Sequence, residues 1–249
     1  MKIALTISGQ PRRYRHGFKE LKRWFLDRYD IDVYMHAWVD KQFYKYDFFN
    51  EGKLQHIYNV EQNTYKNLLD WYQPKKHLFE KAIKFDATDL KGQNNQRLNS
   101  QMGMWLSLKR SWDLLENSGI KYDLVIKTRY DLLWTHRVAE NCIFLEDITQ
   151  VNPEAVSYFE YPARWGMADQ LNDTFAVGGY DVMKIYHNVF PQMLRTIFVD
   201  PEYYQYYYDM FVNETLLRQH LRNHGVPICP VYHGFDGYRG IDGGCAIMR

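Results

Sequence analysis

The chain has 249 residues and is close to neutral, with 31 Lys and Arg against 30 Asp and Glu. A net charge of +1 gives no overall attraction to nucleic acid or to an anionic membrane, so any anion site must be local. The 3 cysteines fit neither a disulfide framework nor a zinc knuckle, and no run approaches the roughly 20 apolar residues that cross a bilayer. We expect a soluble, cytoplasmic protein that binds no nucleic acid and has no transmembrane segment.

The first part of the chain predicts a strand, a helix and a second strand. Ile3 to Ser8 is a short apolar run ended by a Gly-Gln-Pro turn, as in a buried strand. Residues 15–29 place apolar side chains at helical spacing, and Asp32 to Trp38 is another strand-like run. This order is typical of the start of an α/β sheet.

The middle of the chain predicts an insertion followed by a long helix. Residues 40–75 are polar and aromatic and suggest an insertion or lid that contains a helix from Val60 to Tyr72. Residues 96–117 predict the clearest helix, because apolar side chains recur every three or four positions until Ser118-Gly119 ends it. Leu124 to Thr128 then predicts a buried strand.

Shorter elements separated by Pro, Gly and Asn characterise the second half. They comprise apolar runs at 142–145, 156–159 and 174–177, helices at 180–194 and 212–224, a last strand at 226–231 and a Gly-rich loop at 232–244. No repeat or Ser/Pro-rich linker divides the chain. We therefore predict a single domain over residues 1–249.

Polar side chains follow three of the predicted strands. The stretch SGQPRR follows the first strand, His36 and Trp38 end the second, and Thr128, Arg129 and Asp131 follow the strand after the long helix. Ligands of open α/β sheets bind beyond the carboxyl ends of the parallel strands. We therefore expect a pocket at this edge of the sheet.

Two of these clusters suit phosphate. Gly9 lets the backbone approach a ligand and Arg12 or Arg13 can pair with phosphate oxygens, although an ordinary polar turn has the same residues and the Walker spacing is missing. Asp131 can ligate a hard divalent cation that holds a diphosphate, while Arg129 neutralises phosphate charge. A local Arg–Asp ion pair is the alternative explanation.

Aromatic residues make up 17% of the chain, including 21 Tyr and 7 Trp. Such side chains combine an apolar ring with a polar tip and stack well on sugars and bases. The composition therefore favours sugar or base binding, and a tyrosine-rich core explains it equally well.

Several stretches taken together resemble the nucleotide-sugar glycosyltransferases of the GT-A fold. They are SGQPR after the first strand, DVYMHAW in the second, YDLVIKTRYDL after the long helix, DTFAVGGYD, and NETLLRQHLRNHG. Residues 40–95 have no counterpart in that family. The resemblance implies a GT-A (Rossmann-like) α/β fold, a mixed sheet flanked by helices, with the nucleotide-sugar donor half in residues 1–135 and the acceptor half in residues 136–249.

The resemblance also implies a donor site. In GT-A enzymes an Asp-x-Asp motif binds a divalent metal, usually manganese or magnesium, that carries the donor diphosphate; here Arg129 replaces the first acid and Asp131 matches the second. This departure leaves metal dependence open, since an arginine can replace part of the cation's charge. His233 is implied as a further metal ligand and Arg239 as a diphosphate contact in a closing tail. The donor-lining residues are implied to be Ser8, Gly9, Gln10, Arg12, His36 and Arg129.

The acceptor side rests on the last two stretches. FAVGGYD resembles an acceptor-side loop of inverting enzymes, which implies that Gly178 and Gly179 leave room for a sugar. NETLLRQHLRNHG resembles the helix that carries the catalytic base, with Glu214 at the base position, although an acid at a helix start has the same place for electrostatic reasons. Asp173 is a second candidate base or acceptor ligand, and Asp169 is a third.

These features predict a glycosyltransferase, either hexosyl- or pentosyl-, acting in glycan biosynthesis. It would move a sugar from a nucleoside diphosphate sugar to a hydroxyl of a glycan or glycoconjugate, with inversion favoured. Two alternatives remain open. A sulfotransferase or another nucleotide-dependent transferase would use SGQPRR as its phosphate loop and need no metal, whereas a non-catalytic carbohydrate-binding module would bind sugar through Tyr and Trp whether or not nucleotide is present.

Overall fold

The computed structural model describes residues 1–47, 53–85, 95–134, 146–158, 171, 173–199, 212–230 and 245–247. Its centre is a seven-stranded sheet in the order β10-β8-β9-β6-β1-β2-β5. The strands are β1 (Ile3–Gly9), β2 (Ile31–Trp38), β5 (Lys76–Glu80), β6 (Leu124–Thr128), β8 (Val156–Tyr158), β9 (Ala176–Gly178) and β10 (Ile228–Pro230). Within this sheet β9 is antiparallel to both neighbours and the other strands run in one direction, which makes the sheet mixed.

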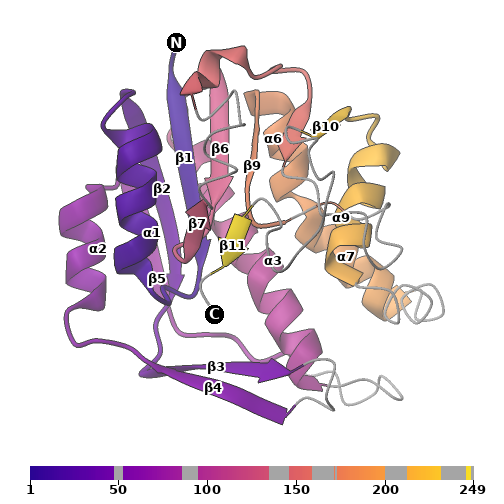
Figure 1. Ribbon diagram of the computed structural model, residues 1–249. Coiled ribbons are helices and arrows are strands. Elements are labelled where there is room, and N and C mark those ends of the chain that lie inside the picture. Colours follow the sequence, from indigo (N-terminus) through magenta and orange to yellow (C-terminus); the bar gives the residue numbers. More distant parts are fainter. Residues whose placement is uncertain are drawn as a thin grey trace, which may run out of the picture.

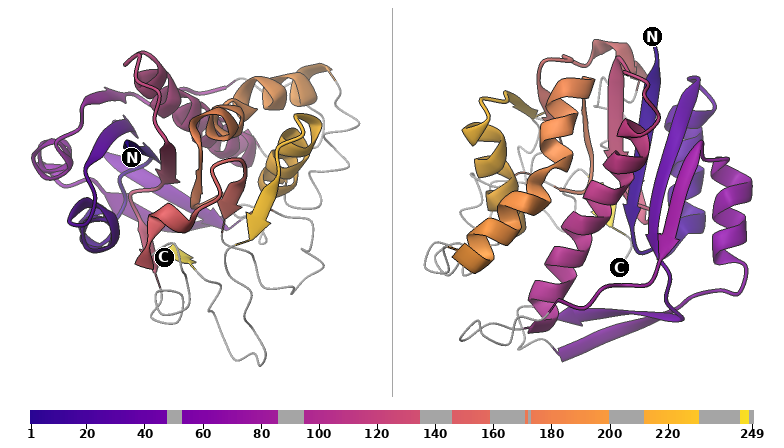
Figure 2. Two further views of the ribbon diagram at one scale, coloured as in Figure 1. Left: turned by 90° about the horizontal axis from the view of Figure 1, so that it is seen from above. Right: turned by 180° about the vertical axis from the view of Figure 1, so that it is seen from behind.

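Helices cover both faces of the sheet, so the predicted α/β class is confirmed (Figures 1 and 2). One face carries α1 (Tyr14–Leu21), its π-helical extension η1 (Lys22–Leu26) and α2 (Thr64–Tyr72). The other carries α3 (Asn95–Glu116), α6 (Tyr180–His187), α7 (Val189–Val199) and α9 (Val212–Asn223), as the view from behind in Figure 2 shows for α3, α6 and α7. A short 3-10 helix, η2 (Ile148–Gln150), is capped at its N-terminus by Asp147, whose side chain accepts a hydrogen bond from the Thr149 amide.

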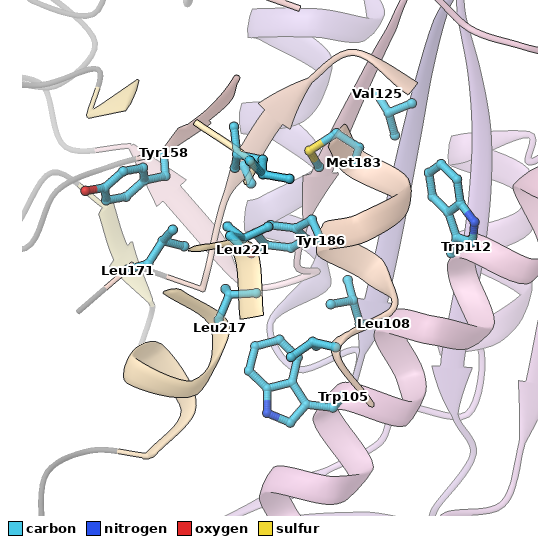
Figure 3. Packing of buried hydrophobic residues seen from close by; sticks show 14 of the residues in the cluster. Trp105, Leu108, Trp112, Val125, Tyr158, Leu171, Met183, Tyr186, Leu217 and Leu221 are labelled. Atoms are coloured by element: carbon cyan, nitrogen blue, oxygen red, sulfur yellow. The ribbon is translucent and has the colours of Figure 1, made fainter. Parts of the chain in front are cut away.

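The two cores follow from the alternation of side chains along each strand. In β1, Ile3, Leu5 and Ile7 face the α1 side, whereas Ala4 faces the α3 side. The predicted apolar stripe of α3 is buried on the latter side at Met102, Trp105, Leu108, Trp112 and Leu115. Figure 3 shows Trp105 and Leu108 of α3 in the same cluster as Tyr186 of α6 and Leu217 of α9.

Two small antiparallel pairs lie outside the main sheet. β3 (Gln42–Asp47) and β4 (Lys53–Asn59) form a hairpin below the carboxyl ends of the parallel strands in Figure 1. β7 (Leu132–Trp134) pairs with β11 (Cys245–Ile247), so a strand near the end of the chain lies beside the segment that follows β6.

Several expectations need correction. The helix predicted over 180–194 is two helices, because α6 ends at His187 and α7 begins at Val189, with Asn188 between them. The insertion expected over 40–75 contains the β3–β4 hairpin before α2, and β5 was not predicted although it is the edge strand of the main sheet. The apolar run at 142–145 and the tail at 232–244 lie outside the described residues.

The remaining strand predictions and the long helix are confirmed within two residues at their ends. The division into a donor half and an acceptor half stays a prediction. Among the residues with a described position, no helix combines the length and the apolar character needed to cross a bilayer.

Two buried histidines should make stability depend on pH. His36 packs between β2, β5 and α3, and His187 is enclosed between β1 and α6; burial lowers the pKa of His36 to about 4 and that of His187 to about 3. Both are neutral in the fold, whereas the unfolded chain takes up protons below its ordinary histidine pKa near 6.5. Their contribution is therefore complete above pH 6.5 and is lost as pH falls towards 4.

Each histidine should contribute a slope of roughly 1.4 kcal/mol per pH unit to the free energy of unfolding in that window. Urea denaturation between pH 7 and 5 measures it. The variant His187→Gln should be less stable at neutral pH and should show a shallower slope than the unsubstituted protein. An unchanged slope would mean that His187 is not a source of the pH dependence.

Candidate functional site

The carboxyl ends of three neighbouring strands meet at one edge of the sheet, as expected. β1 pairs in parallel with β2 up to Gly9 and Ala37, and with β6 up to Ile7 and Thr128. The turns after β1 and β6 therefore start side by side. Gly9 has a φ of 114°, a conformation that favours glycine, and the chain turns there from β1 towards α1.

Asp131 is the centre of the polar group at this edge. Its side chain is 2% exposed, and its Oδ1 accepts a 3.0 Å hydrogen bond from Arg129 Nε. Its Oδ2 accepts a 3.1 Å hydrogen bond from Arg129 Nη2 and lies 3.4 Å from Arg12 Nη2. The side chains of Arg12 and Arg129 are 19% and 20% exposed, so a buried carboxylate holds two arginine side chains that are partly exposed.

Helix α1 fixes the turn that carries this group. A Cβ atom at Gly17 would lie 1.9 Å from the carbonyl oxygen of Tyr130, so α1 contacts that backbone directly because residue 17 has no side chain. The Tyr130 hydroxyl donates a 3.0 Å hydrogen bond to the carbonyl oxygen of His36 at the end of β2. The Tyr130 ring is fully buried, and burial raises its pKa well above the ordinary tyrosine value. The turn is therefore held from both sides.

His36 lies inside the protein rather than on the expected pocket surface. Its Nε2 donates to Glu80 Oε1 at 3.1 Å and its Nδ1 accepts from Ser107 Oγ at 2.6 Å. Both ring nitrogens are thus bonded, and desolvation keeps the ring neutral by lowering its pKa to about 4. This differs from the donor-lining position expected from the sequence, because the alternation along β2 turns residue 36 towards α3.

Asp173 lies at the same edge as Asp131. β9 runs opposite to β6, and Ala176 pairs with Lys127, so the residues that precede β9 lie near the end of β6. Lys127 Nζ donates a hydrogen bond to the carbonyl oxygen of Asp173, and Asp173 as a whole is 7% exposed. The topology therefore brings this candidate base to the expected edge.

Gly178 and Gly179, expected to leave room for an acceptor sugar, lie at the opposite end of the strands from Asp131. Gly178 pairs with Val125 near the start of β6, so the antiparallel course of β9 carries both glycines away from Asp131. A Cβ at Gly178 would lie 2.6 Å from the carbonyl oxygen of Ala155, and one at Gly179 would lie 2.6 Å from that of Pro153. Close backbone packing accounts for both glycines in this structure.

The other predicted site residues lie in different parts of the chain, some of them outside the described residues. Ser8 is buried in β1 and Gln10 is partly exposed in the turn after it, where its carbonyl oxygen accepts a hydrogen bond from the Arg12 amide. Glu214 is the third residue of α9, whose N-terminal end points towards the carboxyl edge in Figure 1. Asp169, His233 and Arg239 lie outside the described residues, so their predicted roles stay predictions.

The described residues do not fit a divalent cation at Asp131. Both carboxylate oxygens already accept from guanidinium groups, and the two adjacent positive charges repel a cation. A hard divalent ion also prefers several oxygen ligands, and the part of the chain that the structure describes contains no cluster of three or more acidic, histidine or cysteine ligands.

Sequence reasoning missed the ion pair between Arg12 and Asp131 and the role of Gly17. A single glycine inside a helical pattern is a signal of close packing or function, so Gly17 could have been found. No local pattern predicts an ion pair between side chains of segments as distant as Arg12 and Asp131.

No protein-family model and no curated protein matches the chain. Among solved structures it is similar to the glycosyltransferase GlyE of Streptococcus pneumoniae TIGR4, with 10% identity and a TM-score of 0.40 over 92% of this chain and 44% of that one. It is also similar to mouse xyloside xylosyltransferase 1, with 8% identity and a TM-score of 0.40 over 92% of this chain and 84% of that one. The chain spans less than half of the GlyE chain. Similarity at this level does not decide an activity, so the functional argument rests on the site itself.

Proposed function

We propose that the protein is a glycosyltransferase that uses a nucleoside diphosphate sugar and transfers the sugar to a hydroxyl of a glycan or glycoconjugate. The observation that carries this proposal is the group formed by Arg12, Asp131 and Arg129 at the carboxyl ends of β1 and β6. This edge is where open α/β sheets bind ligands, and paired guanidinium groups suit a diphosphate.

In the proposed reaction, the acceptor hydroxyl oxygen attacks the anomeric carbon of the donor sugar. A new bond forms between that oxygen and the anomeric carbon, while the bond from the anomeric carbon to the diphosphate oxygen breaks. The diphosphate leaves with the bonding electron pair, and the positive charge of Arg12 and Arg129 stabilises the negative charge that develops on it. A carboxylate takes the hydroxyl proton.

The carboxylate is proposed to be Glu214, with Asp173 as the second candidate. Support for Glu214 comes from the sequence resemblance and from its position in the first turn of α9. Support for Asp173 comes from its place at the same edge as Asp131. Inversion at the anomeric carbon depends on the assignment to Glu214, since a base opposite the leaving group activates a direct displacement.

The aromatic residues give less support to a carbohydrate-binding module than the composition suggested. Trp38, Trp105 and Trp112 are buried in the core, as are Tyr34 and Tyr130. A core role therefore accounts for these rings. The alternative of another nucleotide-dependent transferase shares the arginine group and differs in the donor that it accepts.

Thermal-shift measurements with UDP-, GDP- and CMP-sugars test the proposal directly. A ligand that binds only the folded state at 100 times its Kd stabilises it by about 2.7 kcal/mol, which raises the Tm of a domain of this size by roughly 5 °C or more. We expect one class of nucleotide sugar to do so and to be consumed when a glycan acceptor is added. If no nucleotide sugar shifts the Tm, with or without manganese, the proposed function is wrong.

A further inference from the structure

We infer that Arg12 and Arg129 bind the donor diphosphate directly, so that this protein binds its nucleotide without a divalent cation. The inference deepens the proposed function and rests on it, because it names what holds the diphosphate at the same site. It follows from the arrangement of three side chains, in which one buried carboxylate positions two partly exposed arginine side chains.

The geometry preorganises the arginines. Asp131 is 2% exposed and receives two hydrogen bonds from Arg129, at 3.0 and 3.1 Å, which fix both the position and the plane of that guanidinium group. Arg12 approaches the same Oδ2 from the turn after β1 at 3.4 Å. Two planar cations from the turns after two different strands are thus brought to one carboxylate, which fixes them before an anion arrives.

The charges favour an anion over a cation at this place. The two guanidinium groups and the carboxylate have a net charge of +1, which attracts a diphosphate. A divalent ion bound to Asp131 would have to displace both arginines from the carboxylate oxygens or lie next to them. Asp131 therefore acts as a positioning residue for the arginines rather than as a metal ligand.

The backbone supports this arrangement. Gly17 allows α1 to contact the Tyr130 carbonyl, and the Tyr130 hydroxyl is bonded to the His36 carbonyl oxygen, so the turn that carries Arg129 and Asp131 is fixed to α1 and to β2. Arg12 lies on the turn between β1 and α1. Both arginines are therefore on segments that are joined to α1, one by the chain and one by the contact at Gly17.

The first test is isothermal titration calorimetry of the unsubstituted protein with inorganic pyrophosphate, UDP and GDP. One series is measured in excess EDTA and the other with manganese in a buffer that contains no EDTA. We expect binding in EDTA, with an affinity that manganese leaves unchanged or weakens, because a cation bound to the diphosphate reduces its charge. The Kd should also rise with ionic strength, since exposed charge–charge attraction is screened by salt.

Three substitutions locate the site. Arg12→Met and Arg129→Met should each weaken binding on the order of 10- to 100-fold, the range expected for losing a charged hydrogen-bond donor. Arg15→Met is the matched control: Arg15 is on α1 and pairs with Glu61 at 2.6 Å, so its loss removes the same charge without touching Asp131. If a methionine variant fails to fold, the corresponding lysine variant keeps the charge but loses the guanidinium fork and should bind with intermediate affinity.

Asp131→Asn separates the two explanations. A positioning role predicts that pyrophosphate binding in EDTA weakens, because asparagine offers one acceptor oxygen in place of the two that hold the guanidinium groups, and that manganese does not change the remaining affinity. A metal-ligand role predicts that the unsubstituted protein binds only with manganese and that Asp131→Asn does not bind. That result would overturn the inference but not the proposed function, because the unsubstituted protein would still bind nucleotide. If no nucleotide or pyrophosphate binds under either condition, the proposed function and the inference both fail.

Discussion

Gly17→Ala is expected to destabilise the protein by about 2 kcal/mol. The added Cβ would lie 1.9 Å from the Tyr130 carbonyl oxygen and 2.8 Å from its carbonyl carbon, and a backbone group cannot move aside as a flexible side chain can. Overpacking of this kind usually costs about 1–3 kcal/mol and sometimes more, which exceeds the roughly 1 kcal/mol that alanine gains over glycine inside a helix. Urea denaturation measures the change in the free energy of unfolding.

The same substitution should reduce transfer by the molecules that remain folded. If α1 shifts to accommodate the methyl group, the turn with Arg129 and Asp131 moves relative to Arg12, and a displacement of about 1 Å can cost on the order of 100-fold in rate. Gly103→Ala provides the control, since a Cβ there meets only Trp38 Nε1 at 3.9 Å. That variant should be more stable by about 0.5–1 kcal/mol and fully active. Equal effects of the two substitutions would contradict the close contact of α1 with the turn.

Glu214→Gln is expected to lower kcat by on the order of 100- to 10,000-fold while leaving the KM for the donor unchanged. Glutamine keeps the size of the side chain and removes the group that accepts the acceptor proton, and loss of a general base has effects of this order. Steady-state kinetics with the donor and acceptor found by the screen measure both parameters. The pH profile of any remaining activity should lose the limb that reports ionisation of the base.

Asp173→Asn tests the alternative base under the same conditions. If Glu214 is the base, the asparagine variant should keep kcat within about tenfold of the unsubstituted enzyme, and the glutamine variant should not. Glu154→Gln is a matched control, because Glu154 is exposed just before β8, at the opposite edge of the sheet. Full activity of Glu214→Gln would remove Glu214 from the mechanism and leave inversion without support.

Elements with a strong periodic signal could be predicted from the sequence. α3 was predicted because its apolar stripe is long, and β1, β2 and β6 because their apolar runs end at clear turns. β5 was not predicted because KHLFE is short, partly exposed and has a charged residue at each end. These features are typical of an edge strand. β7 and β11 have three residues each, and a strand of that length carries no periodicity.

The location of the site could be predicted from the sequence, but the arrangement of its side chains could not. The edge itself followed from the general behaviour of parallel strands, and Asp131 and Arg129 were recognised from their position after β6. The sequence does not show the direction of β9. Because β9 is antiparallel to β6, Gly178 and Gly179 lie at the end of the strands opposite to Asp131, which the sequence did not predict. The inward orientation of His36 depends on which face of β2 is covered by α3, and only the folded chain reveals this.

The central position of β1 has a consequence for how the chain is made on the ribosome. β1 lies between β2 and β6, and Thr6 of β1 bonds to the carbonyl oxygen of Ile126, a residue 120 positions later. At 5–20 residues per second, on the order of ten seconds passes between the synthesis of the two strands. During that interval the nascent β1–β2 pair has an open strand edge, a template for wrong pairing with other chains. Aggregation is therefore a greater danger to the half-made sheet than to the finished protein, and chaperone demand should be highest before β6 emerges.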